Sequence, residues 1–196
     1  PVTYDSKYLE IIPREVLDRD YGCGDPSQYV CEGETVLDLG SGGGKICFIA
    51  SQVVGSSGRV IGVDMNDEML ALARKANSEV SQRLRYANVE FRKGKIQDLR
   101  IDRDMLDEWL KKNPIKSESD LIAFESYVKQ ISETSPMIQD GSIDVVISNC
   151  VLNLVNHKDK TMLFQEIYRV LKRGGRAAIS DIVSDEPVPL ELQQDT

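Results

Sequence analysis

The sequence has few of the features that mark several large classes of protein. It contains one histidine and four cysteines in 196 residues, without a Cys-x-x-Cys motif, so a classical zinc site is not expected. No apolar run approaches the roughly 18 residues needed to span a bilayer. The N-terminal segment carries charges every few residues and lacks the apolar stretch of a secretory signal. We therefore expect neither a membrane anchor nor a secretory signal in this chain.

An excess of positive charge is also missing. Lys and Arg total 24 against 32 Asp and Glu, which gives a net charge of −8, whereas nucleic acids and anionic membranes attract the opposite sign. We expect a small-molecule partner, with no nucleic acid and no membrane. The cysteines, widely scattered in a mid-sized acidic chain, argue against a disulfide framework and for a reducing, cytoplasmic setting. They are Cys23, Cys31, Cys47 and Cys150.

Short apolar runs alternate along the chain with segments of helical periodicity. The runs that we predict as strands span residues 36–39, 60–64, 89–91, 143–147 and 176–180. The third alternates apolar and polar residues and is expected nearer an edge of the sheet. Strands that alternate with helices at this spacing are typical of βαβ units. The predicted class is α/β, a doubly wound, Rossmann-like, mostly parallel sheet of at least five strands, in one domain over residues 1–196.

Two helix boundaries can be predicted from end signals. Asn66 can cap the helix that carries Leu72 on its apolar face. Gly174-Gly175 are expected to stop the helix that carries Leu163 and Ile167. Both helices would then connect consecutive predicted strands.

One connection is far longer than the usual roughly 2–6 residues. Residues 100–140 separate the third and fourth predicted strands, and an apolar stripe at helical spacing runs through Leu106 and Trp109. Ser117 with Asp120 is typical of a capping box for a second helix. We predict a helical hairpin inserted after the third strand and packed near it. Its role is open between a decoration of the sheet and a function of its own.

The end of the chain is the second departure from a regular pattern. Only a short segment that includes Pro187 and Pro189 follows the fifth predicted strand, and a doubly wound fold needs that edge covered. The sequence also begins without Met. We therefore expect either that the chain is incomplete at its C-terminus or that a partner covers the edge.

A glycine-rich loop follows the first predicted strand. Asp38, Gly40, Gly42 and Gly44 alternate there, and glycines permit positive φ and close approach of a ligand to the backbone. The dinucleotide fingerprint would require Gly where Lys45 stands. An acid two residues before the first glycine does not suit a phosphate, but it suits an ammonium or a sulfonium. The pattern therefore favours a ligand that carries a positive charge.

A second acid ends the second predicted strand. Asp64 stands where a carboxylate can accept both hydroxyls of a ribose. A glycine-rich loop alone is weak evidence, because a structural turn without a ligand gives the same pattern. The loop, Asp38, Asp64 and the βαβ pattern together favour a bound nucleoside with a cationic group.

Three segments of the sequence then resemble one family. VLDLGSGGG, VIGVDMN and RVLKRGGRAAISD together resemble class I S-adenosylmethionine-dependent methyltransferases, over about residues 34–99 and 140–183. The resemblance implies S-adenosyl-L-methionine as cofactor and a sheet of seven strands, of which this chain has five. It also implies the cofactor-binding residues. These are Asp38 near the methionine amino group, Gly40, Ser41 and Gly42 in the loop, Asp64 at the ribose, Met65, Lys95 and Ile96 around adenine, and Asn149 near the methyl group.

A narrower resemblance lies in YGCG and SNCVLNLV, at residues 21–24 and 148–155, which look like arsenite methyltransferases. In that family the residues matching Cys23 and Cys150 are thiolate ligands that hold trivalent arsenic beside the sulfonium methyl. Thiolates suit a soft, thiophilic centre. The match is incomplete, because a further N-terminal Cys of the family has no counterpart here, a C-terminal Cys would lie beyond Thr196, and the insertion is longer than usual.

The other reactive side chains have simpler interpretations. Cys47 lies among apolar residues of a predicted helix and is interpreted as a small core residue, whereas Cys31 is assigned no role. Cys150 is open between core and ligand, and Cys23 favours function. His157 is either a solvated side chain or a general base.

The sequence therefore predicts a cytoplasmic enzyme that transfers a methyl group from S-adenosylmethionine to a small acceptor. Trivalent arsenic held by cysteine thiolates is the favoured acceptor. A small-molecule C-, O- or N-methyltransferase is the alternative enzyme. A non-catalytic cofactor-binding module that recruits a partner protein is the alternative of another class.

Overall fold

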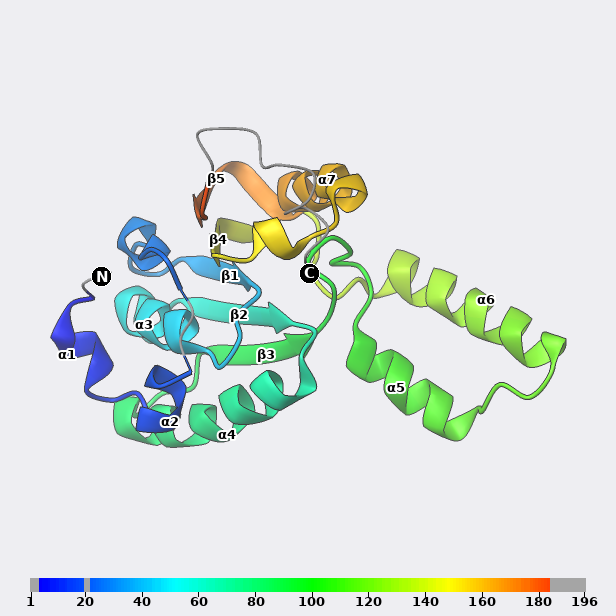
Figure 1. Cartoon of the computed structure of the whole chain (residues 1–196), viewed down its shortest axis with the longest axis horizontal. Coiled ribbons are helices and arrows are strands. Elements are labelled where there is room, and N and C mark those ends of the chain that lie inside the picture. The colour runs from blue at the N-terminus through cyan, green and yellow to red at the C-terminus, as the bar shows by residue number, and fades with distance from the viewer. Residues whose placement is uncertain (1–3, 20–21, 184–196) are drawn as a thin grey trace, which may run out of the picture.

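The computed structural model describes residues 4–19 and 22–183 of the chain. In these residues one sheet of five parallel strands has the order β3-β2-β1-β4-β5 (Figure 1). The strands are β1 Thr35–Leu39, β2 Arg59–Asp64, β3 Val89–Lys93, β4 Ile143–Asn149 and β5 Leu171–Ser180. All five predicted strands are confirmed, and the third lies at an edge as its alternating pattern indicated. The doubly wound α/β class is confirmed as well.

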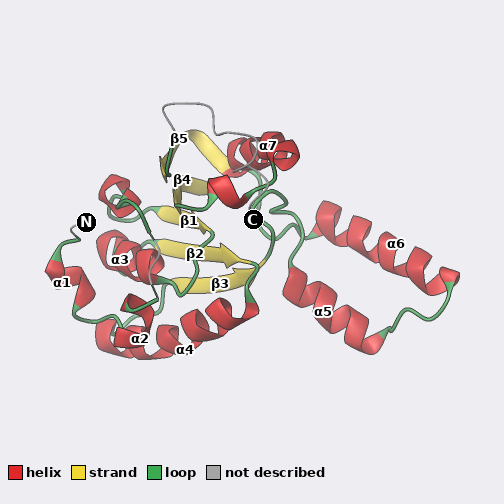
Figure 2. Cartoon of the chain, in the orientation of Figure 1, coloured by secondary structure: helices red, strands yellow, loops and turns green. Residues whose placement is uncertain are grey.

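Helices cover both faces of the sheet (Figure 2). On one face, α3 (Lys45–Val54) and α4 (Asp67–Leu84) pack with Val36, Val60, Val145 and Ile147. On the other face, α7 (Lys160–Val170) packs with Leu37, Leu39, Ile61 and Val146. Successive residues of β1 thus enter opposite cores, which is what the two-residue period of a strand requires. A parallel strand buried on both faces explains the continuous apolar run in the sequence.

Short helices occupy the remaining connections. Two of them, α1 (Ser6–Leu9) and α2 (Arg14–Leu17), precede the sheet, and Val16 joins the core formed with α3 and α4. Three 3₁₀ turns complete the described elements: η1 Pro26–Tyr29, η2 Leu152–Leu154 and η3 His157–Asp159. In the described residues no helix is both long and apolar enough to cross a membrane.

The strand order reverses beside the first strand. β1 pairs with β2 on one side and with β4 on the other, so the connections after β1 and β4 leave toward opposite faces. This reversal opens a crevice at the carboxyl ends of the strands, the place where open α/β sheets bind ligands.

The predicted helical insertion is present and extends away from the sheet (Figure 1). It consists of α5 (Arg103–Lys112) and α6 (Glu118–Thr134), and Ser117 caps α6 through the N–H of Asp120 as expected. Trp109 stacks on Tyr127 with ring centroids 5.2 Å apart. The hairpin therefore has a small core of its own, separate from the two cores of the sheet.

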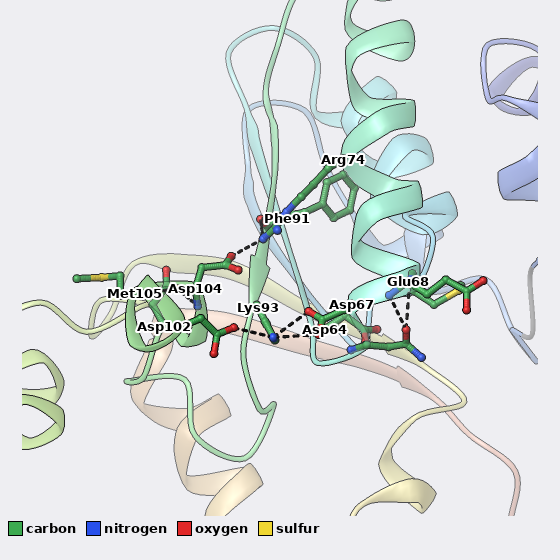
Figure 3. Close-up of polar contacts among 12 residues, drawn as sticks. Asp64, Asp67, Glu68, Arg74, Phe91, Lys93, Asp102, Asp104 and Met105 are labelled. Carbon is green, nitrogen blue, oxygen red and sulfur yellow. Dashed lines mark hydrogen bonds and ion pairs between the residues drawn. The ribbon is translucent and has the colours of Figure 1, made fainter. Parts of the chain in front are cut away.

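Ion pairs fasten the base of the hairpin beside β3 (Figure 3). Lys93, at the end of β3, contacts Asp67 of α4 and Asp107 of α5, each at 2.8 Å. Arg74 of α4 pairs with Asp104 of α5. The prediction that the insertion packs near the third strand is therefore confirmed.

The last strand is longer than expected. α7 ends at Val170, and β5 begins at Leu171, so Gly174-Gly175 lie inside the strand and do not end the helix. Gly174 has a φ of +83°, and the pairing of β4 with β5 is irregular between Ile143 and Val145. The glycines thus mark an irregularity within the strand, a function that a helix-stop interpretation overlooks.

Candidate active site

A cavity of about 830 Å³ opens at the carboxyl ends of the strands, where the strand order reverses. Its walls come from the segments that follow β1, β2, β3 and β4, and from the end of α2. The predicted site residues that line it are Asp38, Gly40, Ser41, Gly42, Asp64, Met65, Ile96, Asn149 and Cys150. Lys95 lies outside this wall, where its backbone pairs with Asp98 in an isolated bridge.

The loop between β1 and α3 is compatible only with glycine at its first turn. Gly40 has a φ of +76°, and a Cβ at this position would lie 2.4 Å from the Cγ1 atom of Val151. The N–H of Gly42 donates a hydrogen bond to the Oδ2 atom of Asp64 at 2.7 Å. The loop is therefore held in place by β2 on one side and by the segment after β4 on the other.

The carboxylate of Asp64 can accept more hydrogen bonds than it receives from the protein. Its Oδ2 atom accepts from the Gly42 N–H, and its Oδ1 atom accepts from the Asn66 N–H at 2.9 Å. Each carboxylate oxygen carries two lone pairs, so each retains one site for a ligand hydroxyl. A side chain fixed by two backbone donors suits recognition of a vicinal diol.

Asp38 is a buried acid at the floor of the cavity, with only 2% of its surface exposed. Burial raises the pKa of its carboxyl to about 7, the thiol of Cys47 lowers that pKa by donating a hydrogen bond, and the charge of Asp64 raises it. The Sγ atom of Cys47 lies 3.2 Å from the Oδ2 atom of Asp38. A ligand ammonium would favour the ionised form of this acid.

The cavity also has an apolar end. Met65 follows β2 with 61% of its surface exposed, whereas Ile96 follows β3 and is buried in the core. Both line the cavity, beside Gly94 and Gln97. An apolar wall next to the polar pair of acids suits the flat ring of a nucleobase.

Two residues that line the cavity, Ser41 and Lys45, have buried polar side chains that the sequence analysis did not predict. The Oγ atom of Ser41 is buried and has no hydrogen-bond partner within the described chain, which is what a missing polar ligand atom would explain. Lys45 is also buried, and its Nζ atom lies 3.6 Å from the centroid of the Tyr4 ring. The sequence could have indicated this lysine, because it stands at the start of an otherwise apolar helix.

The fold brings Cys23 next to Cys150 at the rim of the cavity. Cys150 and Gly22 line the cavity, whereas Cys23 itself does not. The two residues are 127 positions apart in sequence, their Cα atoms lie 5.8 Å apart, and they form a disulfide. The sequence argued against disulfide pairing because the cysteines are scattered, and for this pair that expectation is wrong. Separation along the chain says nothing about separation in a sheet whose strand ends converge.

The rim is built from the ends of two neighbouring strands and one turn. Cys150 directly follows β4, has a φ of +56°, and donates its N–H to the carbonyl of Ser180 at the end of β5. Positive φ is uncommon for a residue with a side chain and is concentrated at functional sites. Cys23 lies in a turn before η1, and its Sγ atom is 3.8 Å from the same carbonyl.

Asn149 links the two parts of the rim. Its Oδ1 atom accepts from the N–H groups of Cys23 and Gly24, at 3.0 and 2.9 Å. Its Nδ2 atom donates to the carbonyl of Gly24 at 2.8 Å. The side chain thus spans the sequence gap between the Cys23 turn and β4.

The remaining cysteines and the histidine lie elsewhere. Cys47 is buried in the core, as predicted, with the additional contact to Asp38. Cys31 is exposed, and its Sγ atom lies 3.6 Å from the guanidinium of Arg176. His157 begins η3 with an exposed side chain and does not line the cavity.

Comparison with known families agrees with this geometry. The family model described as "Methyltransferase domain" matches residues 31–133 and 111–196, which together make up most of the chain. The residues that form the glycine loop, β2 and the segment after β4 all lie inside the match. Most of the site described above therefore lies within the matched residues, whereas Cys23 and the end of α2 precede them.

Individual relatives are similar over nearly the whole chain. The arsenite methyltransferase of Aquipseudomonas alcaligenes is 38% identical over 95% of this chain and 44% of its own length. That of Halobacterium salinarum is 39% identical over 91% of this chain and 35% of its own length. This chain therefore spans less than half the length of these curated relatives.

A solved structure extends the comparison to three dimensions. The crystal structure of an arsenic(III) S-adenosylmethionine methyltransferase from Chlamydomonas reinhardtii aligns with a TM-score of 0.73 and 31% sequence identity. The alignment covers 98% of this chain and 53% of that one. A methyltransferase of Aquifex aeolicus aligns at 0.53 and 22% identity, which shows the shared fold.

Proposed function

Because this chain belongs to the methyltransferase domain family, we propose that it binds S-adenosylmethionine and transfers the methyl group to trivalent arsenic held by Cys23 and Cys150. The observation that carries the proposal is the convergence of two cysteines, 127 residues apart in sequence, on the rim of the cavity. The similarity to arsenite methyltransferases from a bacterium, an archaeon and an alga supports the same acceptor.

The cavity fits the proposed cofactor group by group. Asp64 retains acceptor sites for the two ribose hydroxyls, and Asp38 offers a carboxylate to the methionine ammonium. Met65 and Ile96 supply the apolar wall for adenine. The unpartnered hydroxyl of Ser41 gives a further polar contact. This fit supports assigning the cofactor to the wall between β1, β2 and β3.

The two thiols are the groups that would bind the proposed acceptor, trivalent arsenic. Trivalent arsenic is thiophilic, and two thiolates that converge on one point bind it as a chelate, which one thiolate alone does poorly. The disulfide form has no thiolate to offer, so the pair must be reduced before it can bind arsenic.

The chemical step then depends on alignment. When bound, S-adenosylmethionine would be held by Asp38 and Asp64 and would supply an electrophilic methyl group to the lone pair of the arsenic held by Cys23 and Cys150, with S-adenosylhomocysteine as the leaving group. The protein contributes proximity and orientation, which are worth many orders of magnitude in rate for a well-aligned pair of reactants. No proton needs to be removed from arsenic, so a general base is not required for this transfer.

The deciding experiment is a methylation assay with glutathione-bound arsenite on the reduced protein. We expect turnover by the wild type and none by Cys23→Ser or Cys150→Ser, while Cys31→Ser, which alters the exposed thiol, retains activity. S-adenosylhomocysteine affinity, measured by calorimetry, should be the same in all four proteins.

Two other results would redirect the assignment. A wild type that binds S-adenosylhomocysteine but does not methylate arsenite would favour an organic acceptor, tested with a panel of small nucleophiles. A wild type that binds no S-adenosylhomocysteine would overturn the proposal.

A further inference from the structure

We propose that Asn149 is a positioning residue, which holds the Cys23 turn so that the Cys23 thiol faces Cys150. The inference rests on the proposed function for its catalytic consequence, but not for its geometry. The resemblance in sequence places Asn149 near the methyl group of the cofactor, whereas the contacts of its side chain are with the turn that carries Cys23.

The two cysteines are held in very different ways. Cys150 continues directly from β4, and its N–H bonds to the Ser180 carbonyl at 2.8 Å, so the sheet itself fixes its backbone. Cys23 belongs to no helix or strand. Its backbone N–H bonds to the side chain of Asn149 at 3.0 Å. The position of one thiol is therefore given by the fold, and that of the other by a side chain.

The amide of Asn149 is engaged on both of its ends. Its oxygen has two lone pairs, and two backbone N–H groups, from Cys23 and Gly24, occupy them. Its nitrogen has two hydrogens, which point to the Gly24 carbonyl at 2.8 Å and to the Tyr4 hydroxyl at 3.5 Å. This geometry leaves no lone pair of the amide oxygen for a cofactor, and three of the four hydrogen bonds of the amide are to Cys23 and Gly24.

The turn that carries Cys23 and Gly24 also packs closely against Ser180 at the end of β5. A Cβ on Gly24 would lie 1.8 Å from the Oγ atom of Ser180, so only glycine allows this approach. The Tyr4 hydroxyl donates to the Gly24 carbonyl at 2.8 Å, on the same oxygen that Asn149 contacts. Tyr4 and Asn149 therefore support one carbonyl from two sides, and Asn149 alone of the two lines the cavity.

The consequence is a high effective concentration of one thiol at the other. A thermodynamic measure of that quantity is the equilibrium with glutathione: the two thiols give two electrons and two protons to glutathione disulfide, forming the Cys23–Cys150 bond and two molecules of glutathione. A side chain that holds the thiols together shifts this equilibrium toward the protein disulfide, and it tightens the chelate with a trivalent arsenical in the same proportion.

The experiment titrates the dithiol against glutathione in wild type, Asn149→Ala, Tyr4→Phe and a control, Asn113→Ala, from the loop of the distant hairpin. Binding of phenylarsine oxide and of S-adenosylhomocysteine is measured on the same four proteins. Asn149→Ala should lower both the glutathione equilibrium constant and the phenylarsine oxide affinity at least roughly tenfold, the effect of losing hydrogen bonds to the turn. The affinity for S-adenosylhomocysteine should stay unchanged.

Tyr4→Phe keeps the ring beneath Lys45 and removes only the hydroxyl, so it should shift the same two quantities in the same direction by a smaller factor. Asn113→Ala should match the wild type. If Asn149→Ala does not fold, as shown by circular dichroism, the result for Tyr4→Phe decides whether the turn sets the thiol geometry.

Opposite results would overturn the inference. An Asn149→Ala protein with an unchanged glutathione equilibrium and a weakened S-adenosylhomocysteine affinity would make Asn149 a cofactor residue. A wild type that binds no phenylarsine oxide would overturn the arsenic proposal, while the glutathione titration would still test the role of Asn149.

Discussion

The two halves of the cavity are built by different means. The proposed cofactor side is formed mainly by elements that are adjacent in sequence: β1, the glycine loop and β2. Its two acids, Asp38 and Asp64, lie 26 positions apart. The proposed acceptor side joins Cys23 to Cys150 over 127 positions through a turn and a side chain. Segments close in sequence build the first half, whereas the second half depends on side-chain hydrogen bonds between distant segments. Damage to one half should therefore leave the other intact, and the experiments on the redox state, on Asp64 and on Cys47 test that independence.

The largest effect should come from the redox state of the rim. Protein with the Cys23–Cys150 disulfide intact should show no arsenite methylation, and treatment with dithiothreitol should restore it, because the proposed arsenic ligands are thiolates. S-adenosylhomocysteine affinity, followed by calorimetry, should be equal in the oxidised and reduced forms. Methylation by the fully oxidised protein would contradict the thiolate assignment, and a different S-adenosylhomocysteine affinity in the two forms would contradict the separation of the two halves.

The converse change is made at Asp64. Asp64→Ala should weaken S-adenosylhomocysteine binding by about 1–3 kcal/mol, roughly 5- to 150-fold, because two ribose hydroxyls lose their acceptor. The equilibrium between the Cys23–Cys150 dithiol and glutathione should stay as in the wild type. Glu125→Ala, an exposed acid of α6 that does not line the cavity, serves as a control for a general change of charge. Equal affinity in Asp64→Ala and wild type would remove the cofactor assignment.

A smaller effect is expected from pH. The pKa of Asp38 is raised to about 7 by burial, so below pH 7 a proton must leave this carboxyl before it pairs with the ligand ammonium. Affinity for S-adenosylhomocysteine should therefore rise by at most roughly tenfold per pH unit up to pH 7 and then level off. In Asp38→Asn this pH dependence should vanish, and a wild-type profile that is flat from pH 5 to 8 would contradict the assignment.

The raised pKa of Asp38 also predicts how the free energy of unfolding depends on pH in the absence of ligand. The folded protein keeps a proton on Asp38 that the unfolded chain releases near the ordinary value of 3.8. The contribution of this group to the free energy of unfolding is therefore fully present below pH 3.8, decreases as pH rises toward about 7, and is constant above it. Urea denaturation of wild type and Asp38→Asn at several pH values separates this contribution from those of other groups.

The smallest change should follow substitution of the buried thiol. Cys47→Ser keeps a donor for Asp38 and alters core packing slightly, with an expected loss of stability on the order of 1 kcal/mol. The glutathione equilibrium of Cys23 and Cys150 should not move, since Cys47 belongs to the opposite half. A loss of arsenite methylation in Cys47→Ser comparable to that in Cys23→Ser would show that the halves are coupled.

The same contrast explains which parts could be predicted. The strands, the Asn66 and Ser117 caps and the acids of β1 and β2 follow from local patterns, and all were predicted from the sequence. The hydrogen bonds from Asn149 to the Cys23 turn could not be, because nothing near Cys23 indicates a partner 126 positions away. That Cys23 and Cys150 lie close together was implied by the family resemblance, but their disulfide was not expected, because the spacing of cysteines along the chain does not show which ones meet.

The boundary of β5 shows a different source of error. Gly174-Gly175 have the composition of a helix stop, but α7 already ends at Val170, and the glycines accommodate an irregular start of the strand. Local composition identified a break in regular structure and could not say which element contains it. Tertiary pairing with β4 decides that question.

The hairpin of α5 and α6 begins and ends at neighbouring points in space, which bears on how the fold tolerates added length. It leaves and rejoins the body at adjacent points, where the N–H groups of Met137 and Ile138 bond to the carbonyls of Arg100 and Leu99, each at 2.9 Å. An excursion whose ends already meet is a removable module, since the entropy of closing a loop grows only slowly with its length. Evolution or an engineer can shorten it to a tight turn, or exchange it for another domain, without changing the order of any strand.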